Sequence, residues 1–303
     1  MKQASFFAKI LLFGEYGIIE NAKGLTIPFN FYKGALKFDE NKAQTESNQS
    51  LIEFSNYLLE QMPAQFAMDK LQQDLKKGMY FDSDIPQGYG VGSSGALVAA
   101  VYDAYAIDKI DSEGLSKNKI AELKQILGKM ESFFHGTSSG IDPLICYMNI
   151  PLLIHSKNNI DTVGIPQEKD GNGAIFLINS GVPGKTGPMV QAFFEKMKHE
   201  GFRNTMRREF KKYNDACIDA FVNGNTDPLF SNLKDLSTWA FINFRPMIPQ
   251  RLIQAWENGI QSNDYYLKLC GSGGGGYVLG FTQDFEKAKA ALSDFQLEPV
   301  YRF

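Results

Sequence analysis

Residues 86–96 form the stretch of this sequence best suited to hold a phosphate group. It reads Pro-Gln-Gly-Tyr-Gly-Val-Gly-Ser-Ser-Gly-Ala, and a helix-forming run follows to residue 106. Glycines let a backbone come close to a bulky ligand, and a helix N-terminus offers N–H groups and a positive dipole end to an anion. We interpret Gly88, Gly90, Gly92, Ser93 and Ser94 as a phosphate cradle. The alternative is a glycine-rich turn capped by a serine.

This loop differs from a Walker A loop in its charge. A Walker A loop needs a lysine aimed at the β- and γ-phosphates, whereas no Lys or Arg lies between Met79 and Asp108. Phosphate charge must then be neutralised by backbone dipoles and a metal ion, for which Ser93 or Ser94 supplies a hydroxyl ligand.

A second motif, residues 135–143, contains one carboxylate among small and hydroxyl side chains. It reads His-Gly-Thr-Ser-Ser-Gly-Ile-Asp-Pro, so we expect Asp142 on a tight loop. Such a carboxylate could hold Mg²⁺ or accept a proton from an alcohol. Glu131 closes the preceding helical pattern and could reach the same space. Taken alone, Asp142 is better explained as an Asx-type turn residue, because that is the usual role of Asp in loops.

Two further motifs lie near the ends of the chain. Residues 268–277 read Lys-Leu-Cys-Gly-Ser-Gly-Gly-Gly-Gly-Tyr. Four consecutive glycines are entropically costly unless a ligand or another chain segment packs against the bare backbone; a flexible hairpin loop is the alternative. Residues 9–16 read Lys-Ile-Leu-Leu-Phe-Gly-Glu-Tyr, and by itself Lys9 would be an exposed edge charge.

Hydrophobic periodicity predicts the elements that position these motifs. The predicted strands are residues 5–13, 25–38 with interruptions at Pro28 and Gly34, 79–84, 151–155, 174–179, 267–269 and 277–281. The predicted helices are residues 49–62, 94–106, 117–132, 190–198, 205–222, 227–241, 248–258 and 285–293. Beyond residue 171 most predicted elements are long amphipathic helices. This change in the pattern predicts a domain junction near residues 169–172.

Composition limits the classes of protein that this chain could represent. With 303 residues, 44% hydrophobic side chains and 24 Phe, it can bury a large core. A formal charge of -3 argues against a nucleic-acid surface. Three cysteines without Cys-x-x-Cys spacing predict reduced, buried thiols in a cytoplasmic protein. No apolar run approaches the roughly 20 residues that span a bilayer, so we expect no membrane partner.

The four motifs occur in the order and with the character of the small-molecule kinase family named after galactokinase, homoserine kinase, mevalonate kinase and phosphomevalonate kinase (GHMP kinases). Within it the chain most resembles the mevalonate kinase branch. Residues 9–17 are similar to Lys-x-x-Leu-x-Gly-Glu-His, and residues 86–96 to Pro-x-Gly-x-Gly-Leu-Gly-Ser-Ser-Ala. Residues 135–142 are similar to His-Gly-x-Pro-Ser-Gly-x-Asp, and residues 268–276 to Lys-Leu-Thr-Gly-Ala-Gly-Gly-Gly-Gly.

The resemblance implies roles for single residues. Asp142 would be the catalytic carboxylate that accepts or orients the alcohol proton, and Lys9 would stabilise charge beside it. Ser94 and Glu131 would hold Mg²⁺. The cofactor-binding set would be Gly88, Gly90, Gly92, Ser93, Ser94, Gly273, Gly274 and Gly275. The substrate side would comprise Glu15, Tyr16, His135 and Thr186.

The resemblance also implies an α+β fold of two domains. Residues 1–170 would form a ribosomal-protein-like domain with a left-handed βαβ unit, and residues 171–303 a ferredoxin-like domain, with the active site in the cleft between them. The expected activity is transfer of the γ-phosphoryl group of ATP, with Mg²⁺, to the alcohol of mevalonate, giving 5-phosphomevalonate. The enzyme would be cytoplasmic, a monomer or homodimer, with a small-molecule alcohol and neither nucleic acid nor membrane as partner.

Departures from the family pattern concern the acceptor. Tyr16 replaces the usual His at a substrate-touching position, and Ser138 replaces a Pro. The alternative acceptors are phosphomevalonate, a sugar or homoserine, although the sequence lacks the Gly-Glu-His-x-Asp pattern of galactokinases.

Two alternatives lie outside catalysis by this family. One is a non-catalytic nucleotide or metabolite sensor. The other is a P-loop ATPase or switch protein, because residues 179–186, Asn-Ser-Gly-Val-Pro-Gly-Lys-Thr, nearly spell a Walker A loop.

Overall fold

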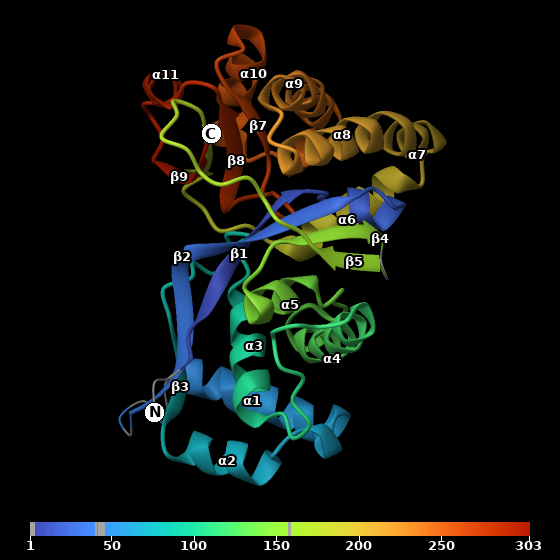
Figure 1. The fold of residues 1–303 in the computed structure, drawn as a ribbon. Helices are drawn as coiled ribbons and strands as arrows, with labels where there is room; N and C mark the ends of the chain where they lie inside the picture. The colour runs from blue at the N-terminus through green and yellow to red at the C-terminus, as the bar shows by residue number, and fades with distance from the viewer. Residues whose placement is uncertain (1–3, 40, 42–45, 157–158) are drawn as a thin grey trace. The chain divides into compact units, whose positions relative to one another are not determined.

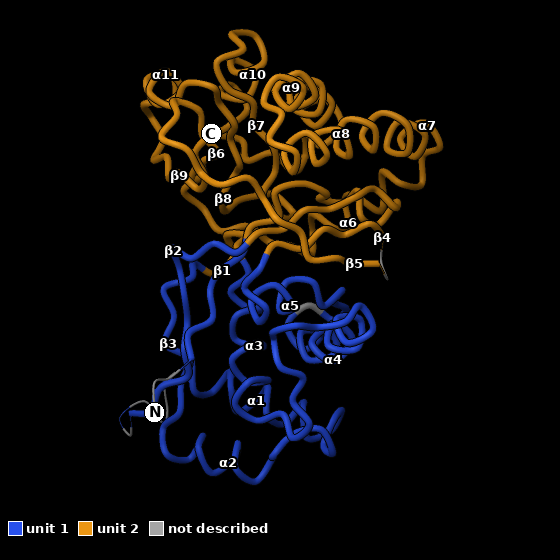
Figure 2. The backbone as a smooth tube through the Cα atoms, in the orientation of Figure 1, with its two compact units in different colours: residues 1–9, 28–86, 92–150 blue, residues 10–27, 87–91, 151–303 orange. Residues whose placement is uncertain are grey.

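The computed structural model describes residues 4–39, 41, 46–156 and 159–303, the side chains of Glu46 and His135 excepted. The chain forms two compact units, drawn in two colours in Figure 2. Unit 1 comprises residues 1–9, 28–86 and 92–150, and unit 2 comprises residues 10–27, 87–91 and 151–303. The division of the chain into domains 1–170 and 171–303 stays a prediction.

Unit 1 is built mainly of helices. In chain order they are α1 (Glu46–Gln61), η3 (Pro63–Gln65), α2 (Met68–Lys76), α3 (Ser93–Tyr105), α4 (Lys117–His135) and α5 (Ile141–Met148). Helix α3 contacts both α4 and α5 (Figure 1). Its small side chains, such as Ala96, Ala99 and Ala100, are buried and let these neighbours approach closely. Strand β3 (Met79–Ser83) pairs antiparallel with Gly34–Phe38 of strand β2 (Gly24–Phe38).

Unit 2 contains the rest of the chain. Its elements are η1 (Gly17–Glu20), β4 (Leu152–Ser156), β5 (Asn159–Thr162), β6 (Ala174–Asn179), α6 (Thr186–Met197), α7 (Glu200–Thr205), the π-helical turn η4 (Met206–Phe210), α8 (Lys211–Val222), α9 (Thr226–Asn243), η5 (Arg245–Met247), η6 (Gln250–Leu252), α10 (Ile253–Ser262), β7 (Tyr266–Leu269), β8 (Tyr277–Thr282), α11 (Phe285–Ala291) and β9 (Leu297–Arg302). Strands β1 (Phe6–Phe13) and β2 each contribute residues to both units.

The sheet β7-β8-β6-β9 forms the core of unit 2. Every residue of β7 and β8 is buried, as fits strands covered on both faces. Helices α9 and α10 contact β7, and α8 packs on α9 (Figure 1). Strand β6 pairs with β8 from Ala174 opposite Thr282 to Asn179 opposite Tyr277. The glycine-rich residues 271–276 therefore connect β7 to β8.

Most predicted elements occur with shifted ends, and three of them differ in more than their ends. Strand β2 is not interrupted: it pairs with β4 through Gly24–Thr26 and with β3 through Gly34–Phe38, and Pro28 lies between these stretches. The helix expected over residues 205–222 contains the π-helical turn η4. The helix expected from residue 248 begins as α10 at Ile253, after 3-10 turns. Elements α2, α5, α7, β5 and β9 were not predicted.

The expectation that Asp142 lies on a tight loop is wrong. Asp142 is the second residue of α5, and the tight turn ends just before it at Gly140, whose φ is 74°. Pro143, which follows, reads as a loop residue in the sequence, but proline is tolerated in the first turn of a helix because the N–H groups there have no helical partner.

Candidate active site

The residues predicted to act in chemistry fall into two groups, one in each unit. Unit 1 contains Lys9, Gly92, Ser93, Ser94, Glu131 and Asp142. Unit 2 contains Glu15, Tyr16, Gly88, Gly90, Thr186, Gly273, Gly274 and Gly275. His135 is the last residue of α4, and its side chain lies outside the described part of the structure.

Lys9 and Asp142 form an ion pair in unit 1, with 2.8 Å between Nζ and Oδ2. The Lys9 side chain is 4% exposed and that of Asp142 is 41% exposed, so the carboxylate faces solvent while the amine lies beneath it. The alkyl chain of Lys9 passes Gly92, where an added Cβ would lie only 2.8 Å from Cγ of Lys9. Lys9 is therefore no exposed edge charge. It is a buried cation directed at the carboxylate.

Glu131 lies on α4 with both carboxylate oxygens hydrogen-bonded. The Ser94 hydroxyl donates to Oε1 at 3.1 Å, and the Ser138 hydroxyl donates to Oε2. Burial, and then the charge of Asp142, raise the pKa of Glu131 to about 7, against the opposing effects of both serines and Lys9. Glu131 is thus a buried carboxylate held in place by two hydroxyl groups.

Close helix packing explains why Glu131 and Asp142 share this space. Gly140, at the start of α5, touches α4 at Gly128, since an added Cβ on Gly140 would lie 2.9 Å from the Gly128 nitrogen. Glu131 is one helical turn after Gly128. Gly95 of α3 packs similarly, because an added Cβ there would lie 2.9 Å from the carbonyl carbon of Asp142. These contacts bring the start of α3 and of α5 together.

The donor set of Ser94 and Glu131 fits Mg²⁺. Octahedral Mg²⁺ has bonds of about 2.0–2.1 Å, which separate adjacent ligands by about 2.9 Å. The observed separation of Ser94 Oγ and Glu131 Oε1 is 3.1 Å. Among the described residues no group of three or more His, Cys, Asp or Glu forms a metal site. Two protein oxygens suffice for Mg²⁺, which usually takes its other ligands from water and phosphate.

The glycine cluster of unit 2 packs against other chain segments. An added Cβ would lie 2.5 Å from the Met247 carbonyl oxygen at Gly273, 2.7 Å from the Gly184 nitrogen at Gly275, and 2.6 Å from Tyr89 Cα at Gly276. The flexible-hairpin alternative therefore fails. The close approach that four glycines predicted is made by the chain itself, and Gly88 joins the same assembly by accepting a hydrogen bond of 2.8 Å from the Gly184 amide.

Glu15, Tyr16 and Thr186 surround this glycine loop. Lys268 forms a buried ion pair with Glu15. The Tyr16 hydroxyl donates to the Ser272 carbonyl oxygen at 2.7 Å, and the Ser272 hydroxyl lies 3.3 Å from that of Thr186. The structure thus brings together Glu15, Tyr16 and Thr186 with residues 268–276, all inside unit 2.

The Walker-like residues 179–186 do run from a strand, β6, to a helix, α6. However, β6 pairs antiparallel with both neighbours. Backbone donors that a phosphate would need are used within the chain: the Gly181 amide donates to Asn179 Oδ1 and the Ser180 amide to the Gly276 carbonyl oxygen. These observations argue against a P-loop.

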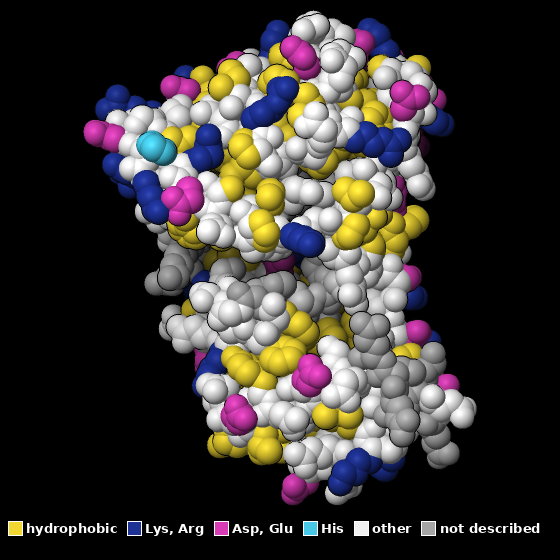
Figure 3. Space-filling view, turned by 180° about the vertical axis from the view of Figure 1, so that it is seen from behind, with side chains coloured by type: hydrophobic (Ala, Val, Ile, Leu, Met, Phe, Trp, Pro, Cys, Tyr) yellow, Lys and Arg dark blue, Asp and Glu magenta, His cyan; other side chains and the backbone are white. Residues whose placement is uncertain are grey.

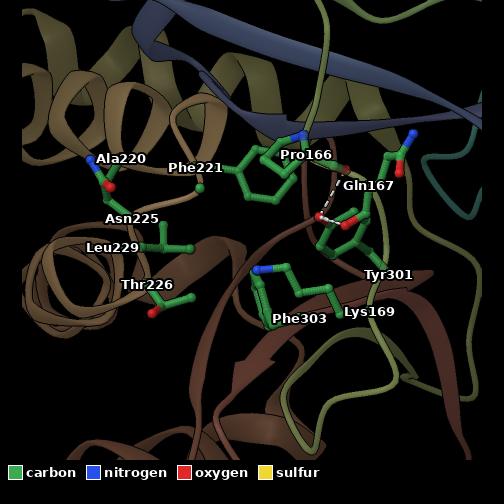
Figure 4. Close-up of a pocket in the computed structure, with 11 residues that line it drawn as sticks. Pro166, Gln167, Lys169, Ala220, Phe221, Asn225, Thr226, Leu229, Tyr301 and Phe303 are labelled. Atoms are coloured by element: carbon green, nitrogen blue, oxygen red, sulfur yellow. Dashed lines mark hydrogen bonds between the residues drawn. The ribbon is translucent and has the colours of Figure 1, made fainter.

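A small pocket in unit 2 contains none of the predicted residues. Apolar side chains from α8, α9 and β9, including Phe221, Leu229 and Tyr301, line it, and the side chain of Lys169 lies at Phe303 (Figure 4). The Tyr301 hydroxyl is bonded to the carbonyl oxygens of Pro166 and Gln167. Its lining combines apolar side chains with Lys169, Asn225 and Thr226, and none of these residues belongs to the four sequence motifs.

Three observations concern the expectations drawn from the composition: the surface charges, the helices and the cysteines. On the face drawn in Figure 3, basic and acidic side chains are interspersed. Within the described ranges, no helix combines the length and apolar character that crossing a bilayer requires. Cys146, Cys217 and Cys270 are all buried and form no disulfide, as predicted.

Unit 1 thus combines a helix that starts directly after Gly92, a serine of that helix, Ser94, bonded to the buried Glu131, and the ion pair of Lys9 and Asp142. Residues 56–149 match the family model described as the GHMP kinases N terminal domain. The predicted resemblance to this family is confirmed.

Solved structures share the fold of the whole chain. Mevalonate kinase of Methanococcus jannaschii is similar over 99% of this chain and 98% of its own, with a TM-score of 0.62 and 18% identity. Phosphomevalonate kinase of Streptococcus pneumoniae, in complex with phosphomevalonate and AMPPNP, is similar over 99% and 100%, with a TM-score of 0.67 and 15% identity. Galactokinase of Lactococcus lactis is similar over 99% and 94%, with a TM-score of 0.65 and 12% identity. No curated protein sequence matches the chain.

Two residues of the candidate site were not predicted from the sequence. Ser138 holds Glu131, and its signal is the run of hydroxyl residues directly after the helix that carries Glu131. Lys268 pairs with Glu15, and no signal in the sequence indicated this contact. Ser138, which replaces a proline of the family pattern, thus helps to hold Glu131 in unit 1.

Proposed function

We propose that this protein is an ATP- and Mg²⁺-dependent kinase that transfers the γ-phosphoryl group to the alcohol of mevalonate. The observation that carries the proposal is the pair of Lys9 and Asp142, next to the start of α3 and to Glu131. Phosphoryl transfer asks little covalent chemistry of a protein and depends on positioning and charge stabilisation. A buried cation, an accessible carboxylate and a helix N-terminus supply both.

In this proposal each residue of unit 1 has one role. Asp142 accepts or orients the proton of the attacking hydroxyl, since its carboxylate is accessible. Lys9 stabilises the negative charge that develops on the alcohol oxygen. Gly92 and Ser93 bind the nucleotide phosphates at the N-terminus of α3. Ser94 and Glu131 would hold Mg²⁺, which when bound neutralises phosphate charge.

The choice of mevalonate rests on the four motifs and on the fold shared with solved mevalonate kinases. We propose that the two domains are a left-handed βαβ domain and a ferredoxin-like domain, and that the enzyme is cytoplasmic, as the family resemblance implies. Phosphomevalonate, a sugar or homoserine would be the next acceptors to test, because the fold is also shared with phosphomevalonate kinase and galactokinase.

ADP release tests this proposal. Purified protein with Mg-ATP is incubated with mevalonate, phosphomevalonate, galactose and homoserine in parallel. We expect ADP release that depends on mevalonate and is abolished in Asp142→Asn. Nucleotide binding without turnover on any alcohol would support the sensor alternative and refute the kinase.

A further inference from the structure

Tyr16 lies at the centre of a strained turn in unit 2. Its φ is 59° and its ψ is -32°, and the Gly17 amide donates to the Glu15 carbonyl oxygen at 2.6 Å. This is a γ-turn of the positive-φ type, which is rare and strained, and positive φ is unfavourable for a bulky residue. Such a conformation persists only where its surroundings determine it strongly. The contacts that hold Tyr16 in this conformation therefore indicate the role of the residue.

The side chain of Tyr16 is fully engaged within the chain. Its hydroxyl donates to the Ser272 carbonyl oxygen at 2.7 Å. Its ring stacks on Phe193, with 4.5 Å between centroids, and contacts Phe244. Only 8% of the residue is exposed. Burial, and then the charge of Glu15, raise the pKa of the phenol, which keeps its proton on the hydroxyl for donation.

Glu15, the residue before Tyr16, makes a second contact with the same segment of unit 2. Glu15 forms its buried ion pair with Lys268 of β7, and Tyr16 bonds to Ser272 four residues later. Because of the γ-turn, the side chains of Glu15 and Tyr16 reach two residues of one segment, Lys268 and Ser272. That segment is further fixed by the Gly274 amide, which donates to the Met247 carbonyl oxygen at 2.6 Å.

We propose that Tyr16 is a positioning residue that fixes the glycine loop, residues 271–276, and that it does not contact the acceptor. The inference rests on the proposed kinase function and changes one part of it, because Tyr16 stands where the family's usual His touches the substrate. The single phenolic proton is already donated to Ser272, and the ring is packed between aromatic side chains. Acceptor recognition must then come from other side chains.

Hydrogen exchange of the glycine loop tests this proposal without any activity measurement. Tyr16→Phe removes the hydroxyl and keeps the ring. The matched control is Tyr265→Phe, because Tyr265 is also buried and donates to a backbone carbonyl oxygen at 2.7 Å, that of Ala255. We expect the amides of residues 271–276 to exchange about 3–10-fold faster in Tyr16→Phe, the effect of one lost hydrogen bond, and unchanged in the control. Equal exchange in both variants would overturn the proposal.

Steady-state kinetics separate positioning from substrate contact. For Tyr16→Phe we expect kcat to fall while the KM for mevalonate stays within about 2-fold, since uniform binding contacts alter KM and positioning alters kcat. For Tyr16→His we expect no lower KM for mevalonate. A KM raised about 10-fold in Tyr16→Phe with unchanged loop exchange would assign Tyr16 to the acceptor. If the protein is not a kinase, the exchange result still decides the positioning role.

Discussion

Replacing Glu131 by Gln should stabilise the protein without ligands at high pH. The folded-state pKa of Glu131 is raised to about 7, from its ordinary value of 4.5. Because it is raised, the contribution of Glu131 to stability is fully present below pH 4.5 and is lost as the pH rises through 7. The glutamine side chain carries no charge at any pH and keeps the shape, and the hydroxyls of Ser94 and Ser138 can turn to suit its amide.

The size of this stabilisation follows from the raised pKa of Glu131. The rise of the Glu131 pKa from 4.5 to about 7 corresponds to at most about 3 kcal/mol. Part of it belongs jointly to Glu131 and Asp142, because their charges interact. We therefore expect the Glu131→Gln variant to be more stable than the wild type by about 1–3 kcal/mol at pH 8, and by no measurable amount at pH 4.5.

The assay must report on unit 1. Trp239 and Trp256 both lie in unit 2, so tryptophan fluorescence does not follow unit 1 unfolding. Hydrogen exchange of α4 and α5 peptides in increasing urea, with EDTA present, measures the local free energy of unfolding. The control is Glu122→Gln on the same helix, whose side chain is 52% exposed. Equal stability of wild type and Glu131→Gln at pH 8 would refute the reasoning.

Three further substitutions test the proposed roles. Asp142→Asn should keep ATP affinity, measured by calorimetry, and lower kcat by about 10²–10⁴-fold; retained turnover would remove Asp142 from catalysis. Ser94→Ala should raise the Mg²⁺ concentration needed for half-maximal rate, with a rate loss of about 10-fold at saturation; an unchanged metal titration would contradict its role as a ligand. Lys185→Ala should leave nucleotide affinity unchanged and raise the KM for the acceptor, whereas loss of nucleotide binding would favour the P-loop alternative.

The elements that carry Lys9 and Ser94 could be predicted because their signals are local, whereas the roles of these residues come from the family resemblance and stay predictions. Lys9 lies in an apolar run, residues 6–13, that is typical of a strand, and Ser94 lies at the start of a helix that follows glycines, so both elements follow from the local sequence. Helix α5 escaped prediction because Asp142 and Pro143 resemble loop residues, whereas the capping turn at Gly140 makes them the start of a helix.

Contacts between segments far apart in the chain could not be predicted from the sequence. The ion pair of Glu15 and Lys268 joins residues 253 positions apart, and the bond from Tyr16 to Ser272 joins residues 256 positions apart. No periodicity encodes such pairs. The four glycines indicated a close approach correctly, but only packing decides whether a ligand or Tyr89 and Gly184 makes it.

The most direct test of the central claim follows the phosphoryl group itself. ATP labelled at the γ-position is incubated with Mg²⁺, mevalonate and either the wild type or Asp142→Asn, and the products are identified by mass spectrometry. We expect the label to appear on the alcohol oxygen of mevalonate with the wild type and to be nearly absent with the variant. Label that reaches only water, or that reaches mevalonate equally well with both proteins, would contradict it.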